Sequence, residues 1–155
     1  MKNFLNALKT ILIPVIVGLI SGLLIQDSVG LYDVLIKPPF ALDAKYFSVV
    51  WGILYVLMGI SLYLFKTNAE GEALREGKLF FYIQLALNFL WSIIFFNLEL
   101  PLVAFIELLV LFVFVLITTI KFYEENKLAG LLLVPYAIFL VYAGYLNFAL
   151  WFLNM

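Results

Sequence analysis

The sequence predicts an all-α, polytopic membrane protein, a bundle of five transmembrane helices. The chain has 155 residues, of which 66% are hydrophobic and only 12% charged, whereas soluble domains are about half apolar and a quarter charged. Its mean hydropathy is +1.16. A helix needs about 20 apolar residues to cross a bilayer, so five helices use roughly 100 residues and leave short connections. We therefore expect one membrane domain over residues 1–155.

Five long apolar runs give the expected spans. They lie at about residues 8–26, 47–65, 79–98, 102–122 and 129–152. Each run is predicted to be helical, because a backbone in lipid must satisfy its own hydrogen bonds. The first run also has features of a signal peptide, since it follows a short basic lead. Residues 23–28 offer no small-residue cleavage site, however, so we expect this span to be retained.

The connection at residues 27–46 is long for a small bundle. Long loops in compact proteins are usually functional or disordered, and we interpret this one as a lid loop. Lysines and arginines predict the orientation: seven lie in the amino-terminal lead and in the links at 66–78 and 121–127, against two in the lid loop. By the positive-inside rule, we expect the amino terminus to be cytoplasmic and the carboxyl terminus outside.

Composition excludes several kinds of chemistry. The chain has no cysteine and no histidine, which removes disulfides, thiolate nucleophiles and the usual ligands of zinc and haem iron. No glycine-rich phosphate loop is present. The net charge of −1 gives no basic footprint for nucleic acid. We therefore expect no metal site and no nucleic-acid partner.

A polar and aromatic stripe marks the inner face of the third span. Gln84, Asn88, Trp91 and Phe95 recur at helical spacing. Amides that face lipid are costly, so this stripe is predicted to face the interior of the bundle. Two interpretations remain at this point. The stripe either joins helices to one another or forms the wall of a ligand pocket.

Two other spans carry aromatic and small residues on one face. Trp51 and Tyr55 share a face of the second span, and Trp51 is either a pocket residue or a member of the interfacial aromatic belt. The fifth span carries two aromatic residues, a small residue and an amide on one side: Tyr136, Phe139, Ala143 and Asn147. The small residue among them lets another helix or a ligand come close.

Two further features of the spans have open interpretations. Gly18 and Gly22 form a G-x-x-x-G pair, a spacing typical of close helix contact, either within the bundle or across a homodimer. Glu107 is the only carboxylate well inside a span, and an ionisable group there is a functional candidate by default. It serves either a proton-coupled transporter or the packing of helices.

A series of motifs then follows in a fixed order along the chain. The motifs are Lys37-Pro38-Pro39-Phe40; Phe47, Trp51 and Tyr55; Gln84, Asn88, Trp91 and Phe95; Ala104-x-x-Glu107; and Pro135-Tyr136 with Ala143 and Asn147. In this order, over about residues 14–154, the chain resembles the translocator protein/tryptophan-rich sensory protein family (TspO/MBR, the peripheral-type benzodiazepine receptor). The resemblance implies a five-helix bundle, often a homodimer, with a pocket beneath the first loop.

The resemblance also implies a function. Members of the family bind porphyrins, including protoporphyrin IX and haem, and also sterols and drug-like lipophiles. Some bacterial members are reported to promote light- and oxygen-dependent porphyrin breakdown. We therefore expect a receptor or carrier in a bacterial plasma membrane, with tetrapyrroles as ligands and no required cofactor. We expect binding and not catalysis; breakdown of the porphyrin is the alternative.

Carried over position by position, the resemblance assigns the ligand-binding residues. They are Pro38, Pro39, Phe40, Phe47, Trp51, Tyr55, Gln84, Asn88, Trp91, Phe95, Tyr136, Phe139, Ala143 and Asn147. The two prolines fix φ at the base of the lid loop. Phe139 stands where the family usually has tryptophan, and a phenyl ring keeps the stacking face but is harder to oxidise. Of the indole pair implicated in porphyrin breakdown, this chain keeps Trp51.

Overall fold

The structure is a computed structural model that describes residues 2–155. Met1 lies outside the described residues, as do the side chains of Lys2, Asn3, Val29, Leu31 and Ala44, the first of which belongs to the predicted basic lead. Every secondary-structure element in residues 2–155 is helical. Five segments are long and apolar enough to cross a membrane: Phe4–Ile25, Lys45–Asn68, Gly71–Asn97, Pro101–Glu125 and Lys127–Leu153. The predicted fold class is confirmed.

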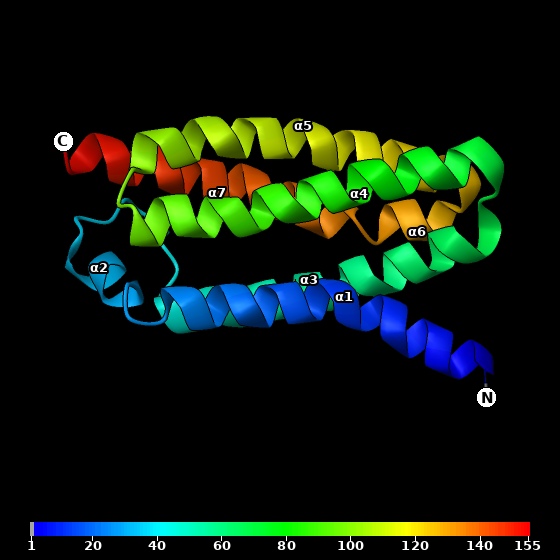
Figure 1. Cartoon of the computed structure of the whole chain (residues 1–155). Helices are drawn as coiled ribbons and strands as arrows, with labels where there is room; N and C mark the ends of the chain where they lie inside the picture. The colour runs from blue at the N-terminus through cyan, green and yellow to red at the C-terminus, as the bar shows by residue number, and fades with distance from the viewer. Residues whose placement is uncertain (1) are drawn as a thin grey trace.

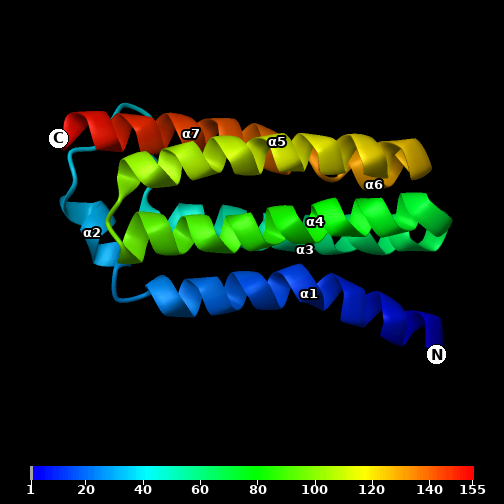
Figure 2. The ribbon, with the colours of Figure 1, turned by 45° about the horizontal axis from the view of Figure 1, so that its top comes forward.

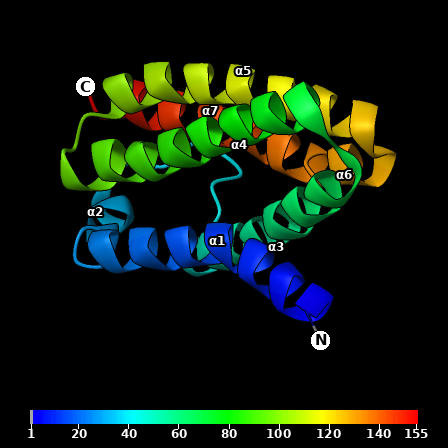
Figure 3. The same cartoon turned by 45° about the vertical axis from the view of Figure 1, so that its right-hand side comes forward.

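The helices run side by side along one common direction (Figures 1 and 2). In chain order they are α1 (Lys2–Ile25), α2 (Val29–Val34), α3 (Ala44–Asn68), α4 (Gly71–Ser92), the π-helix η1 (Ile93–Asn97), α5 (Pro101–Glu125), α6 (Lys127–Leu131) and α7 (Val134–Leu153). The short helix α2 lies within the lid loop. Figure 3 shows that α3 diverges from α4 towards the end of the bundle where α2 lies, whereas α1 runs away from α4 towards the amino terminus at the other end.

Glycines set how closely α1 approaches α3, its main neighbour. A Cβ atom added at Gly59 would lie 2.4 Å from the backbone oxygen of Ile11, and one added at Gly18 would lie 2.3 Å from Cδ2 of Tyr55. Both positions therefore require glycine, as small residues at contacts between membrane helices generally permit close approach. Gly18 of the predicted G-x-x-x-G pair thus makes its contact within the chain.

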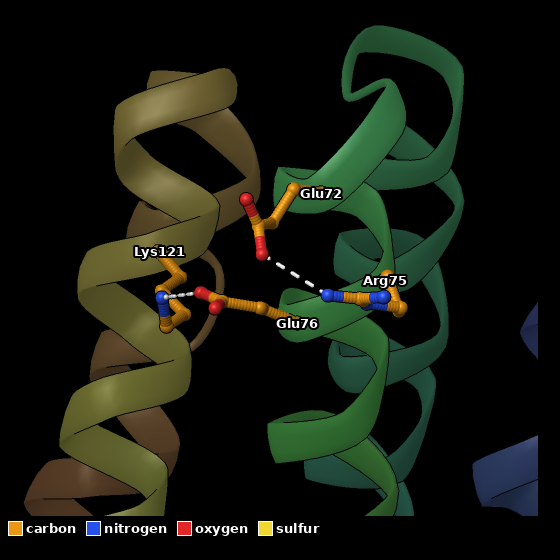
Figure 4. A network of polar contacts seen from close by, with 4 residues as sticks. All are labelled: Glu72, Arg75, Glu76 and Lys121. Atoms are coloured by element: carbon orange, nitrogen blue, oxygen red, sulfur yellow. Dashed lines mark hydrogen bonds and ion pairs between the residues drawn. The ribbon is translucent and has the colours of Figure 1, made fainter.

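The charged link predicted at 66–78 is almost entirely helical. Only Ala69 and Glu70 separate α3 from α4. Arg75 Nη2 lies 3.0 Å from Glu72 Oε1 one turn away on α4, and Lys121 Nζ of α5 lies 2.7 Å from Glu76 Oε2 (Figure 4). Charged residues end an apolar run in the sequence, but they do not end a helix, because i,i+3 ion pairs support a helical turn.

The fifth predicted span, 129–152, is divided into α6 and α7. Leu132 and Leu133 separate the two helices, and Pro135 lies in the first turn of α7. Proline is tolerated there because the backbone N–H groups of the first turn have no hydrogen-bond partner within the helix, so the N–H group that proline lacks is not missed. The third predicted span is also irregular at its end: Leu98 N donates to Ile93 O, which closes the wider turn of η1. Single π-helical turns often occur at functional sites.

Candidate ligand cavity

A cavity of about 400 Å³ lies in the half of the bundle nearer the lid loop. Residues of α1, α2, α3, α4, η1 and α7 line it, and the wide turn of η1 brings the consecutive residues Phe95 and Phe96 to the same wall. The aromatic and polar lining residues are Ser21, Tyr32, Phe47, Ser48, Trp51, Tyr55, Trp91, Ser92, Phe95, Phe96 and Asn147. Ligand pockets of this kind enclose about 300–1,000 Å³ and are mostly apolar.

Trp51 stands at the centre of the aromatic residues around this cavity. Its ring centroid lies between 5.5 and 6.1 Å from those of five other rings: Phe47, Tyr55, Trp91, Tyr136 and Phe139. The perpendicular contact with Phe139 is the shortest, at 5.5 Å and 87°. Aromatic pairs with such spacing and tilt contribute favourably beyond the burial of their surface. Trp51 is therefore a cavity wall inside the bundle and not a residue of the interfacial belt.

Trp91 gives the cavity a second indole. Its ring centroid lies 6.1 Å from that of Trp51, with 32° between the ring planes, and both rings line the cavity. The resemblance implied that only Trp51 remains of the indole pair implicated in porphyrin breakdown, and it assigned Trp91 to the ligand-binding residues. The relative rotation of α3 and α4 brings this second indole against Trp51, a contact that no single-helix spacing reveals.

The predicted amide Asn88 holds tyrosine rings and does not line the cavity. The Tyr55 hydroxyl donates to Asn88 Oδ1, and Asn88 Nδ2 donates to the Tyr136 hydroxyl oxygen at 3.0 Å. Tyr55 lines the cavity, whereas Asn88 and Tyr136 lie behind it. The three side chains join α3, α4 and α7 through a buried hydrogen-bonded chain. Asn88 therefore fixes the orientation of one wall.

Asn147 has a similar arrangement at the other side of the cavity. Trp91 Nε1 donates to Asn147 Oδ1 at 3.0 Å, and Asn147 Nδ2 donates to the backbone oxygen of Pro101 at 2.7 Å. This side chain lines the cavity beside Ala143. Its amide orients the Trp91 ring and ties α7 to the start of α5.

Gln84, which is buried, and Glu107, which is half-buried with buried carboxylate oxygens, lie outside the cavity lining. Both amide atoms of Gln84 and both carboxylate oxygens of Glu107 lack a hydrogen-bond partner in the described part of the chain. The stripe, which continues from α4 into η1, is thus divided: Trp91 and Phe95 line the cavity, while Gln84 and Asn88 do not. Phe139 likewise contacts Trp51 from behind the lining.

The predicted lid-base residues do not reach the cavity. Pro38 is buried, whereas Pro39 is exposed and Phe40 is 89% exposed. The backbone of Phe40 also has a φ of 65°, in the left-handed region that residues other than glycine rarely adopt. A residue in such a conformation persists only where its surroundings hold it, at a cost of about 1–3 kcal/mol.

Side chains of α7 hold the backbone of the lid loop. The Tyr142 hydroxyl donates to Phe40 O at 2.9 Å and accepts from Leu42 N at 3.0 Å. The Tyr145 hydroxyl donates to Pro39 O at 2.9 Å. Sequence reasoning missed both tyrosines, although their i,i+3 spacing near the predicted outer end of the fifth span places them on one face.

Two further side chains complete this attachment. Asn154 accepts from Ile36 N at 2.9 Å and donates to Ile36 O at 3.0 Å, and the Tyr32 hydroxyl donates to Leu42 O at 2.8 Å. Burial is the main cause that raises the pKa of Tyr32, with smaller contributions from Tyr142, Asp43 and Asp33. The Tyr32 hydroxyl therefore stays protonated and remains a donor at neutral pH.

Comparison with known proteins places these features in context. The model of the TspO/MBR family matches residues 10–152. The "Tryptophan-rich protein TspO" of Archaeoglobus fulgidus is 35% identical over 98% of this chain and 99% of its own length. "Protein CrtK" of Rhodobacter capsulatus is 39% identical over 79% and 78%, and the human "Translocator protein" is 36% identical over 66% and 62% of the two chains.

Proposed function

The chain belongs to the TspO/MBR family of membrane proteins, and we propose that it is a receptor or carrier for porphyrins and other planar lipophilic molecules. Protoporphyrin IX and haem are the representative ligands, and the site is the cavity beneath the lid loop. The observation that carries this proposal is the position of Trp51, which lines the cavity at the centre of five other rings.

The physical fit is between a flat apolar ligand and flat apolar walls. Aromatic side chains stack on a conjugated macrocycle, each contact contributing about 0.5–1.5 kcal/mol. The amides of Asn88 and Asn147 hold two of the walls in place before a ligand arrives, so little ordering of side chains opposes binding. Gly22 of α1 and Gly52 of α3 leave open space where side chains would otherwise narrow the cavity.

We further propose the membrane orientation that the charges indicate. The amino terminus lies at the same end of the bundle as the α3–α4 and α5–α6 links, and the lid loop and carboxyl terminus lie at the other (Figure 1). The positive-inside rule then favours a cytoplasmic amino terminus. In a bacterial plasma membrane, the lid loop would open to the outer side.

Titration with protoporphyrin IX in the dark tests the proposed binding. Quenching of tryptophan fluorescence in detergent-purified protein should saturate, and Trp51→Ala should weaken the affinity by about tenfold or more, because aromatic anchors contribute about 1–3 kcal/mol. Trp151→Ala is the matched control, since Trp151 lies outside the cavity lining and contacts Phe148 near the end of α7. Equal affinities in the two variants would refute the proposed cavity.

A second candidate function is light- and oxygen-dependent porphyrin breakdown, which the Trp51–Trp91 pair favours. Illumination of the porphyrin-loaded protein should then remove porphyrin absorbance faster than in a protein-free control. Trp51→Phe, which keeps a stacking ring, should abolish the difference. A rate equal to that of the protein-free control would leave binding as the only activity.

A further inference from the structure

Among the residues that the structure describes, none of those lining the cavity is charged. Its lining consists of apolar and aromatic residues, three serines, two tyrosines and one asparagine. Tyr32, Tyr55 and Asn147 already use their polar atoms in hydrogen bonds within the protein. A carboxylate buried against this wall would lose its hydration and gain no opposite charge, which is strongly unfavourable. An acidic ligand must therefore keep its carboxylate at the rim of the cavity.

Lys37 is not part of the lining, but it lies against one residue of the wall, Tyr32. Its Nζ atom lies 4.6 Å from the centroid of the Tyr32 ring, and Tyr32 lines the cavity. The other two lysines that stack on rings in the described part of the chain are Lys45 and Lys121. They lie over Tyr46 and Phe80, which are not part of the lining. Lys37 is thus a cation against the outer wall of an uncharged cavity.

The present partner of Lys37 holds it only weakly. Asp33 Oδ1 lies 3.4 Å from Lys37 Nζ, and the Asp33 side chain is 67% exposed. Exposed ion pairs with this geometry contribute little to stability. The four-carbon stem of a lysine lets its ammonium group move between neighbouring acceptors. A carboxylate that leaves the cavity beside Tyr32 can therefore replace Asp33.

Resting on the proposed function, we propose that Lys37 binds the carboxylate of an acidic planar ligand while the apolar body of that ligand lies against Trp51. The substrate class of the cavity is then a flat lipophile with an acidic edge. The same molecule with its acid groups esterified keeps the stacking contacts and loses the ion pair. Asp33 acts as an internal competitor for the ammonium group of Lys37.

A comparison of protoporphyrin IX with its dimethyl ester tests this assignment in the full-length, detergent-purified protein. Lys37→Gln should weaken binding of the diacid by about fivefold, the upper range for a partly exposed ion pair, and should leave the ester unchanged. Lys45→Gln is the matched control and should change neither affinity. Added salt should weaken the diacid in the wild type and have little effect in Lys37→Gln.

A second variant is expected to raise the affinity for the diacid, where Lys37→Gln lowers it. Asp33→Asn removes the competing carboxylate, so the diacid should bind more tightly and the ester should not change. If Lys37→Gln weakens the binding of diacid and ester equally, Lys37 supports the lid loop and does not bind the carboxylate. If it changes neither affinity, Lys37 contacts no ligand. Either result overturns this inference and leaves the proposed function standing. Failure of both ligands to bind the wild type would overturn the proposed function as well.

Discussion

The two ends of the bundle use the same kinds of residue and pack them in opposite ways. At the closed end, formed by Phe65, Gly77, Phe81 and Phe122, three rings stack. The centroids of Phe65 and Phe122 are 4.0 Å apart and nearly parallel, and those of Phe81 and Phe122 are 5.7 Å apart. At the open end, formed by the cavity lining, rings surround about 400 Å³ of space.

Glycines show the difference most clearly. At the closed end, a Cβ atom on Gly77 would lie 2.2 Å from Cζ of Phe65, so the Phe65 ring occupies the space that a side chain at residue 77 would need. At the open end, Gly22 and Gly52 have no atom within 4 Å of the corresponding position. Gly77 therefore makes room for a ring at the closed end, as Gly18 does for Tyr55 at the open end, whereas Gly22 and Gly52 leave space beside the cavity unfilled. Composition alone does not distinguish the two roles; the relative rotation of the helices does.

The largest expected effect is the loss of a stacked ring at the closed end. Phe122→Ala removes the ring that contacts both Phe65 and Phe81, and should lower the free energy of unfolding by about 3 kcal/mol, as for other buried phenylalanines. Phe95→Ala is the matched change at the open end, where the ring contacts Trp91 and Phe96 but also lines the cavity, and should cost less, about 2 kcal/mol. Unfolding in SDS, followed by circular dichroism, measures both. Equal losses would contradict the difference between the ends.

An intermediate effect on stability is expected when two glycines of the same helix, one closely packed and one beside the cavity, are replaced by alanine. Gly59→Ala on α3 forces a methyl group against the backbone oxygen of Ile11 and should destabilise the protein by about 2 kcal/mol. Gly52→Ala on the same helix meets open space and should be neutral or stabilising by up to about 1 kcal/mol, because alanine favours a helix. Thermal unfolding distinguishes these outcomes. A comparable loss of stability in Gly52→Ala would show that the open end is filled.

The smallest expected effect concerns the lid loop. Tyr142→Phe removes the hydroxyl that bonds to Phe40 O and Leu42 N, and should loosen this segment by about 0.5–1.5 kcal/mol. Hydrogen–deuterium exchange should become several-fold faster at the Leu42 amide. Tyr123→Phe, an exposed tyrosine near the end of α5, is the control and should leave exchange in the lid loop unchanged. Unaltered exchange in Tyr142→Phe would show that α7 does not hold the loop.

The fold followed from the sequence because its physical cause is local. An apolar run long enough to cross a bilayer has to be a helix, and Gln84 and Asn88 had to face the interior; both are buried. The interruptions of the helices within the apolar runs were harder to predict from the sequence. The separation of α6 from α7 had only Pro135 as a signal, and the π-helix η1 had none, because its wider turn depends on packing against neighbouring helices.

The cavity was harder to predict because it depends on how neighbouring helices are rotated. Periodicity places Asn88 and Trp91 on one stripe, but only the packed bundle shows that Trp91 reaches the cavity while Asn88 is used by two tyrosines. Phe40 was expected at the lid base, yet its side chain points outward from a left-handed backbone. The lid attachments from Tyr142 and Tyr145 join residues about a hundred positions apart, which no local spacing records.

The most direct test of the central claim uses the glycine amides as reporters in the intact protein. Protoporphyrin IX is added to isotopically labelled protein in detergent, in the dark, and the nuclear magnetic resonance signals of the glycine N–H groups are compared. We expect shifts at Gly18, Gly22 and Gly52, which line the cavity, and none at Gly77 or at Gly130, which is packed against Tyr123. Shifts confined to Gly77 and Gly130, or no shift at any of the five, would contradict a ligand site at the open end.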